Sequence, residues 1–204
     1  MLYLFFDIDE TLCLGSHPIL LDEIHGLRSA LLHKIKIPQA CREHPPIGFE
    51  KAEEIMIFYL DLHSQLFKLC KENADFFKVY FITSGRGNKA EFFIPIFNFA
   101  FKTQGFFTHQ NFIGESEIRN DFEKKPIDEQ RAYSQITKDE TIFKIMRTLG
   151  LSPQQCLLID DSETQRTAAN KKLIPTLDPT TSDYVTEIER ILSFTPNVGY
   201  ESEV

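Results

Sequence analysis

The sequence is poor in several residue types that mark specialised protein classes. It has no tryptophan, only nine glycines and ten prolines among 204 residues, and four cysteines, at positions 13, 41, 70 and 156. The cysteines are scattered and include no C-x-x-C pair, so reduced thiols in a cytosol-like compartment are the expected state. With 42% hydrophobic and 25% charged residues, the composition is that of a globular protein and not of a fibrous or disordered one.

Long hydrophobic runs are also missing. No apolar stretch approaches the roughly 20 residues that cross a membrane. The apolar start of the chain stops at Asp7, with no basic leader or cleavage site. We therefore expect a cytoplasmic protein with no membrane span in this stretch. The formal charge of −8 opposes attraction to nucleic acid and to anionic membrane surfaces, so we expect neither as a partner.

Short continuous apolar runs predict parallel strands that are buried on both faces. Each of the three clearest runs ends in polar residues suited to chemistry. Two weaker runs are expected to add a strand each. The three clear runs span residues 2–6, 78–82 and 156–159, and the weaker two span 173–177 and 111–113.

Helical patterns separate these runs. Gly150 is expected to stop one helix, and Ser182 to cap the last. Strands that alternate with helices predict an α/β, Rossmann-like parallel sheet with helices on both faces. The expected helices span about 16–35, 49–70, 89–101 and 140–148, then a stretch that follows Arg166, and finally 182–192.

We expect a single domain, residues 1–204, that carries two insertions. The helix of about 49–70 leads directly into the second strand, which leaves residues 15–48 as a small helical, cap-like insertion after the first strand. Residues 114–136 are polar and charged, and are expected to form a second excursion or long loop. Neither insertion is long enough to build a core of its own, so we expect an open active site.

The three clear strands end in residues that suit a single site. Asp7 and Asp9 follow the first strand, and Asp160 and Asp161 follow the third. Because ligands of open parallel sheets bind outside the carboxyl ends of the strands, these carboxylates are expected to converge there. They would repel one another strongly without a hard divalent cation, so the sequence predicts Mg²⁺.

The end of the second strand offers groups for an anion. Thr83, Ser84 and the backbone N–H groups of the loop through Gly85 can donate hydrogen bonds to a phosphate. A lysine could neutralise the rest of the phosphate charge. The predicted phosphate-binding residues are therefore Thr83, Ser84, Gly85 and a lysine.

These motifs resemble those of the haloacid dehalogenase (HAD) superfamily, specifically its aspartate-nucleophile phosphatases. DIDET at 7–11 is similar to the first motif of that family, FITSG at 81–85 to the second, and LLIDDS at 157–162 to the fourth, in the same order. The resemblance covers about residues 1–14 and 49–192, and implies a HAD-type fold and a Mg²⁺-dependent phosphatase.

The third motif of the family is a lysine, and two residues compete for it. Lys138 begins a predicted helix 22 residues before Asp160 but lacks the usual proline. Lys125 is followed by Pro126 but lies 35 residues before Asp160. We favour Lys138 and keep Lys125 as the alternative.

The resemblance also implies a role for each residue. Asp7 would attack phosphorus and form an aspartyl-phosphate, while Asp9 would protonate the leaving oxygen and then activate water. Mg²⁺ would be held by Asp7, the backbone carbonyl of Asp9 and Asp161, with Asp160 as a ligand or acting through water. Thr83 and the lysine would hold the phosphate.

Several functional alternatives stay open. A small-metabolite phosphatase or a phosphomutase would use the same residues, and a non-catalytic interaction module could keep the same fold. The G-x-G-x-x-A pattern at 85–90 is a weak dinucleotide signal that lacks its acidic partner. The short insertions and a first motif similar to that of capless phosphoprotein phosphatases favour a protein substrate. Phosphotyrosine, packed on nearby phenylalanines, is the first choice.

Overall fold

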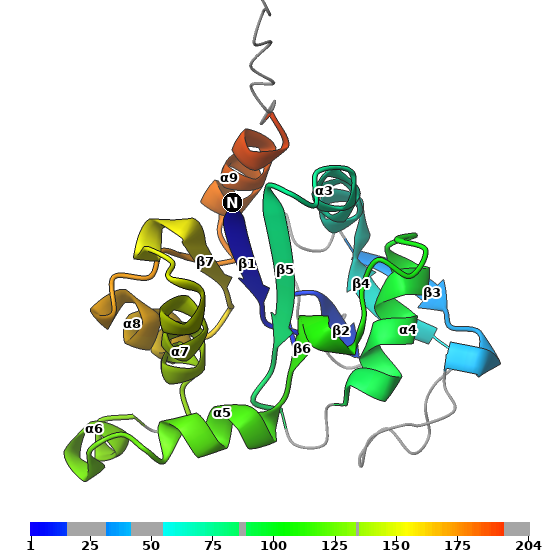
Figure 1. Ribbon diagram of the computed structural model, residues 1–204. Helices are drawn as coiled ribbons and strands as arrows, with labels where there is room; N and C mark the ends of the chain where they lie inside the picture. Colours follow the sequence, from blue (N-terminus) through cyan, green and yellow to red (C-terminus); the bar gives the residue numbers. More distant parts are fainter. Residues whose placement is uncertain (16–31, 42–54, 86–88, 134, 194–204) are drawn as a thin grey trace, which may run out of the picture.

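Five parallel strands form the central sheet of the computed structural model, which describes residues 1–15, 32–41, 55–85, 89–133 and 135–193. The strand order is β6-β5-β1-β7-β8, with β1 hydrogen-bonded between β5 and β7 (Figure 1). All five expected strands are present, although the two weaker ones are only two residues long. Their bounds are β1 Leu2–Phe6, β5 Phe77–Ile82, β6 Phe112–Ile113, β7 Cys156–Ile159 and β8 Thr176–Leu177.

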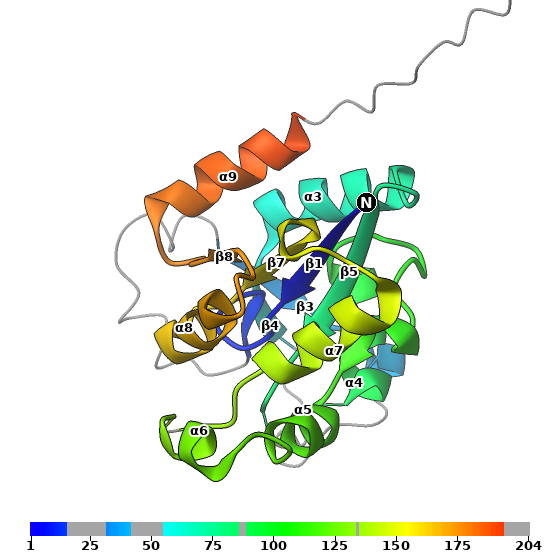
Figure 2. The same cartoon turned by 60° about the vertical axis from the view of Figure 1, so that its left-hand side comes forward.

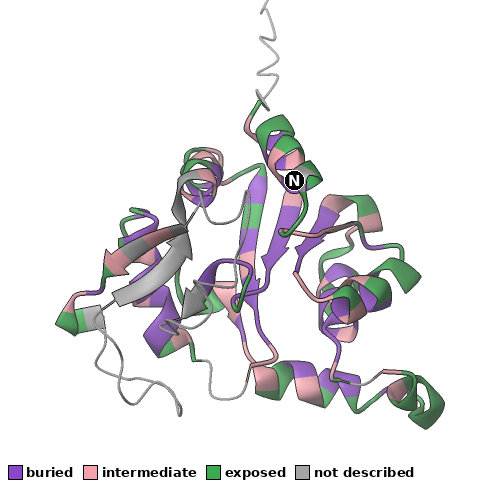
Figure 3. Ribbon diagram, turned by 180° about the vertical axis from the view of Figure 1, so that it is seen from behind, coloured by how far each residue is buried: buried purple, intermediate pink, exposed green. Residues whose placement is uncertain are grey.

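Both faces of this sheet are covered, as the continuous apolar runs predict. Leu4 and Phe6 face one hydrophobic cluster, while Tyr3 and Phe5 face the other. Figure 1 shows helices α3 (Leu60–Glu72) and α4 (Ala90–Ala100) on one side of the strands, with α7 (Asp139–Leu149) and α8 (Glu163–Lys171) on the other. Strands β1 and β7 are buried along almost their whole length, whereas both residues of β8 are half-buried (Figure 3). The predicted α/β sheet with helices on both faces is confirmed.

The helix ends follow local backbone chemistry. Gly150 takes the left-handed conformation that glycine allows at low cost (φ 67°), and its N–H donates to the carbonyl of Met146, which ends α7 as expected. Helix α8 begins at Glu163, earlier than predicted. Thr181 is the N-cap of the last helix, α9 (Ser182–Leu192), so the expected cap at Ser182 is one residue late. Helix α9 contacts α3 (Figure 2).

A second, smaller sheet corrects the prediction of a helical insertion. Strands β2 (Cys13–Gly15), β4 (Ile55–Tyr59) and β3 (Leu32–Lys36) form an antiparallel sheet in the order β2-β4-β3. The predicted helices were therefore wrong over 32–35 and 55–59, where backbone pairing between distant segments replaces local helical bonds. The rest of these two predicted helices before those strands, 16–31 and 49–54, lies outside the described residues.

Residues 114–136 also differ from the long loop that their polarity suggested. They contain α5 (Glu115–Phe122) and α6 (Ile127–Arg131). Ile118 and Phe122 are buried on one side of α5, which contacts α7. An amphipathic helix of this kind packs on the core through a narrow apolar stripe, so its overall polarity is no guide to its structure.

The remaining elements of the described residues are short helices. Among the described residues, no helix is both long enough and apolar enough to cross a membrane. Three single-turn 3-10 helices lie at Gln39–Cys41, His109–Asn111 and Pro153–Gln155.

Candidate active site

Backbone pairing carries two aspartates to the carboxyl edge of the sheet. The N–H of Asp7, directly after β1, donates to the carbonyl of Ile159 at 2.9 Å. The N–H of Asp160, directly after β7, donates to the carbonyl of Leu177 at 3.2 Å. Asp7 and Asp160 thus extend neighbouring strands by one residue, and both are buried, with 7% and 0% of their surface exposed.

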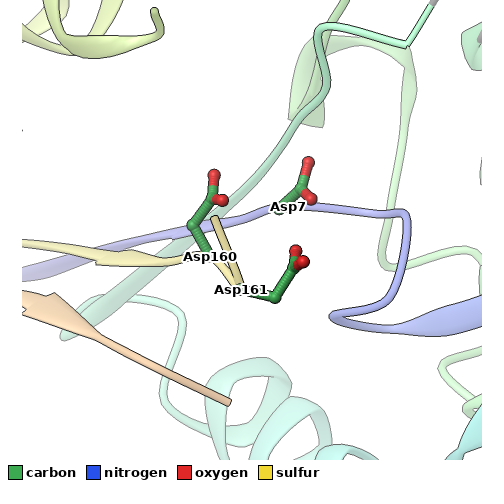
Figure 4. A group of neighbouring side chains, drawn as sticks. All are labelled: Asp7, Asp160 and Asp161. Atoms are coloured by element: carbon green, nitrogen blue, oxygen red, sulfur yellow. The ribbon is translucent and has the colours of Figure 1, made fainter. Parts of the chain in front are cut away.

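Three carboxylates come together at this edge. Asp7, Asp160 and Asp161 each offer an oxygen, and these oxygens all lie within 4.8 Å of one another; Figure 4 shows the three side chains, Asp7 after β1 and the other two after β7. Burial raises the pKa of Asp7 well above its ordinary value, and the charge of Asp160 adds to that shift. Burial, Asp160 and Glu10 likewise raise the pKa of Asp161. Oxygen ligands at this spacing fit a hard cation such as Mg²⁺.

Lys138 lies among these carboxylates. Its Nζ donates to Oδ1 of Asp7 at 2.5 Å and to Oδ2 of Asp160 at 2.7 Å, and the residue is 1% exposed. Burial alone would lower the pKa of Lys138, but the two carboxylates raise it above its ordinary value. With all three carboxylates ionised, one lysine offsets one of three negative charges, and a divalent cation would balance the remainder.

The competing lysine lies elsewhere. Lys125 is also buried, but its Nζ donates to both carboxylate oxygens of Asp139 at 2.8 Å and to Oγ1 of Thr137 at 3.2 Å. The structure therefore brings Lys138, and not Lys125, to Asp7.

Asp9 lies in a tight turn after β1 and is exposed. Within the described residues, the close carboxylate group does not include it, although its charge contributes to the raised pKa of Asp7. The turn closes through the N–H of Glu10, which donates to the carbonyl of Cys13 at 2.9 Å, with Glu10 in the left-handed region (φ 59°). The predicted role of the Asp9 carbonyl as a metal ligand stays a prediction.

The expected phosphate-binding residues follow β5. Thr83 is buried, and its N–H donates to the carbonyl of Ile113 at 3.0 Å, which anchors the end of the strand. Its Oγ1 accepts a hydrogen bond from the N–H of Gly85 at 3.0 Å. Ser84 and Gly85 are half-buried, and residues 86–88 lie outside the described residues. Phosphate binding by Thr83, Ser84 and Gly85 stays a prediction.

Several residues that support the site were not identified from the sequence. Thr11, fully buried, donates from Oγ1 to Asp161 at 3.4 Å. Arg166 donates to the backbone carbonyls of Asp160 and Asp161 at 2.8 and 2.6 Å, and pairs with Asp178 at 2.7 Å. Thr11 belongs to the first motif, so its position was available as a signal. Arg166 acts through contacts that form only in the folded protein and that residue spacing does not predict.

Comparisons with known proteins give distant structural likenesses. No protein-family model matches the chain, and no curated protein does. A HAD-superfamily hydrolase from Ehrlichia chaffeensis matches 93% of this chain and 97% of its own, with 13% identity and a TM-score of 0.44. The fission yeast RNA polymerase II CTD phosphatase, bound to beryllium fluoride, matches 94% of this chain but only half of its own, with 9% identity and a TM-score of 0.40.

The order of the strands explains how the motif residues meet. The parallel order β6-β5-β1-β7-β8 places the first and fourth motifs on adjacent strands, and Asp7, Asp160 and Asp161 meet at their carboxyl ends. The fold is an α/β fold, with a five-stranded parallel sheet between two layers of helices (Figure 1). This architecture is the one implied by the motif resemblance.

Proposed function

We propose that this protein hydrolyses phosphomonoesters through an aspartyl-phosphate on Asp7. The observation that carries the proposal is the buried contact of Asp7 with Lys138, beside the carboxylates of Asp160 and Asp161. An oxygen nucleophile, a fixed cation and a place for a metal are the parts that phosphoryl transfer requires.

The proposed reaction has two displacements. A carboxylate oxygen of Asp7 attacks phosphorus, the ester P–O bond breaks, and Asp9 gives a proton to the leaving oxygen. Asp9 then takes a proton from water, which attacks the same phosphorus and releases inorganic phosphate and the Asp7 carboxylate. Lys138 and Thr83, with Ser84 and Gly85, would hold the phosphoryl oxygens throughout.

Mg²⁺ is the proposed cofactor. Asp7, Asp160 and Asp161 would hold it, together with the backbone carbonyl of Asp9. When bound, the ion supplies positive charge to the phosphoryl oxygens. Asp160 also accepts from Lys138 and, at its other oxygen, from the N–H of Ser162 at 3.0 Å, so its carboxylate is held in one orientation.

For the substrate, we propose a phosphorylated side chain on a protein. The support is the short insertions and the form of the first motif. The further choice of phosphotyrosine has lost one of its arguments, because Phe92, Phe93 and Phe97 are buried in the core and do not line a surface. Phosphotyrosine stays the first peptide to test.

The experiment begins with hydrolysis of p-nitrophenyl phosphate in the presence of Mg²⁺, with and without EDTA. Asp7→Asn keeps the shape of the side chain but removes the attacking charge, so we expect turnover to fall by several orders of magnitude while the protein stays folded. Appreciable activity in Asp7→Asn would exclude Asp7 as the nucleophile. Comparison of kcat/KM for phosphotyrosine peptides, phosphoserine peptides and sugar phosphates then tests the substrate class, and a preference for sugar phosphates would contradict a protein substrate.

A further inference from the structure

The segment that carries Lys138 is held from several sides. Oε1 of Gln165 accepts a hydrogen bond from the N–H of Lys138 at 2.9 Å, and Nε2 of the same residue donates to the carbonyl of Ile136 at 2.9 Å. Nε2 of Gln135 donates to Oγ of Ser162 at 2.8 Å. These bonds tie the backbone before α7 to the segment that follows Asp160.

On either side of Lys138, the same segment is bound to Lys125. Its Nζ contacts Thr137 and Asp139, the two residues that flank Lys138 in the chain. The Lys125–Asp139 pair is buried, with 2% of each side chain exposed. The Nζ of Lys125 also lies 5.3 Å from the ring centre of Phe122 and 5.1 Å from that of Tyr133.

We propose that Lys125 is a positioning residue for Lys138, an inference that rests on the proposed function. A lysine side chain has four flexible carbon–carbon bonds, so its ammonium is placed accurately only if its backbone is fixed. Lys125 fixes that backbone through both neighbours of Lys138, and it touches neither Asp7 nor Asp160. The two lysines that compete for one motif thus have separate tasks.

The charges around the Lys125–Asp139 pair explain why the start of α7 would move if Lys125 were removed. Among the described residues, the other cation that pairs with Asp139 is Lys172, whose Nζ is 3.9 Å away and which pairs more closely with Glu140 at 2.7 Å. Without Lys125, the buried Asp139 would keep only this longer contact. A buried carboxylate with weakened pairing is costly, and the start of α7 would shift to bring it closer to a partner or to water.

The test uses a variant that avoids leaving a charge unpaired. Lys125→Met combined with Asp139→Asn removes both charges at once and keeps the side-chain shapes close to the originals. The control, Lys68→Met combined with Glu72→Gln, removes an exposed ion pair of α3. Each pair of changes is made in the wild-type protein and in Lys138→Met, and kcat and KM are measured well below the unfolding temperature of each protein.

If Lys125 acts by positioning Lys138, the loss of activity caused by the Lys125/Asp139 changes should depend strongly on whether Lys138 is present. We expect kcat/KM to fall about 10- to 100-fold in the wild-type background, mainly through kcat. In Lys138→Met the same two changes should cost no more than about 2-fold, because the residue that Lys125 positions is already absent. The same fold loss in both backgrounds, or no loss in either, would overturn the proposal, and the α3 control should have no effect.

A second measurement does not depend on turnover. The ¹⁵N signal of the Lys138 ammonium, identified by its absence in Lys138→Met, should shift or broaden in the Lys125/Asp139 variant and stay unchanged in the α3 control. An unchanged signal would overturn the positioning role even in an active enzyme. If the wild-type protein lacks phosphatase activity but the signal shifts, the proposed function fails and the positioning of Lys138 stands.

Discussion

At the scale of single residues, burial and charge oppose each other at Lys138. Removal from water disfavours its ammonium, but Asp7 and Asp160 raise its pKa above the ordinary value. Lys138 therefore stays protonated at neutral pH and remains a cation that can offset a phosphate. At Asp7 burial has the larger effect. It raises the pKa of the carboxyl well above its ordinary value, although Lys138 acts to lower it.

This balance predicts the effect of removing the cation. Lys138→Met keeps most of the side-chain volume but leaves Asp7 and Asp160 without their shared donor, and we expect kcat/KM to fall about 10²- to 10³-fold. Steady-state hydrolysis of p-nitrophenyl phosphate is the measurement. Lys124→Met, which alters a lysine whose side chain is 63% exposed, is the control and should keep normal activity. Activity of Lys138→Met within a few-fold of wild type would contradict the role of Lys138.

The cluster of carboxylates provides a second prediction at this scale. Asp161→Asn replaces one of three clustered carboxylates by a neutral and weaker ligand. We expect the Mg²⁺ concentration for half-maximal activity to rise at least about tenfold. A Mg²⁺ titration of kcat measures this, and an unchanged requirement would exclude Asp161 as a ligand.

Both candidate lysines could be identified from the sequence, but no physical property of the sequence decided which of them contacts Asp7. Both Lys125 and Lys138 are buried, and both pair with aspartates. Which aspartate each one meets depends on how α5 and α7 pack, and that is a contact between distant segments. Gln165 and Arg166 were not recognised as supporting residues for the same reason, because the backbone of Lys138 and the carboxylate of Asp178, which they bind, come near them only in the folded chain.

At the scale of elements, continuous apolar runs predicted strands reliably only where no helical pattern adjoined them. The run of β4, IMIFY, was assigned to a helix for that reason. The residues of β1 and β7 are nearly all buried, so their runs have no competing interpretation. The sequences of β3 and β4 are five residues long and adjoin segments with helical spacing, and such runs are ambiguous by periodicity alone. Their partners are distant in the chain, and antiparallel pairing decided the outcome.

The contact of α5 with α7 predicts a pH-dependent contribution to stability. Burial acts to raise the pKa of Asp121, but hydrogen bonds from Lys124 and Lys144 lower it below its ordinary value. A lowered pKa in the folded state stabilises the protein above the unfolded pKa of about 3.9, and this stabilisation is lost as the pH falls through the folded value. We expect Asp121→Asn to cost about 1 kcal/mol at neutral pH.

Chemical denaturation of both proteins at a series of pH values tests this contribution. The difference between wild type and Asp121→Asn should shrink as the medium is made strongly acidic. Glu117→Gln, at a 4.0 Å contact with the same Lys144, is the matched control and should have a smaller effect. A difference that does not vary with pH would show that Asp121 acts through packing and not through charge.

At the scale of the whole molecule, the site is where the parallel sheet requires it to be. Strands β1 and β7 are adjacent and point the same way, so the residues that follow them share one edge. For this reason the convergence of Asp7, Asp160 and Asp161 could be predicted from the order of the runs. The exposed position of Asp9 could not, because it depends on the turn geometry at Glu10.

Three carboxylates and one lysine at this edge also predict that Mg²⁺ stabilises the fold. A ligand that binds only the folded state raises the free energy of unfolding by about 2.7 kcal/mol at 100 times its Kd. Thermal unfolding should therefore shift upward with Mg²⁺ in the wild-type protein and less in Asp161→Asn. KCl at matched ionic strength is the control. An equal shift with KCl would show general screening in place of binding at this site.

The proposed mechanism requires Asp7 to carry the phosphoryl group during turnover. The most direct test is to quench the enzyme during hydrolysis of p-nitrophenyl phosphate with Mg²⁺, reduce acyl phosphates with borohydride, and locate the resulting homoserine by peptide mass spectrometry. If Asp7 is the nucleophile, homoserine should appear at position 7, and only when substrate is present. Active turnover without that product, or homoserine at Asp9 or Asp160 instead, would contradict it.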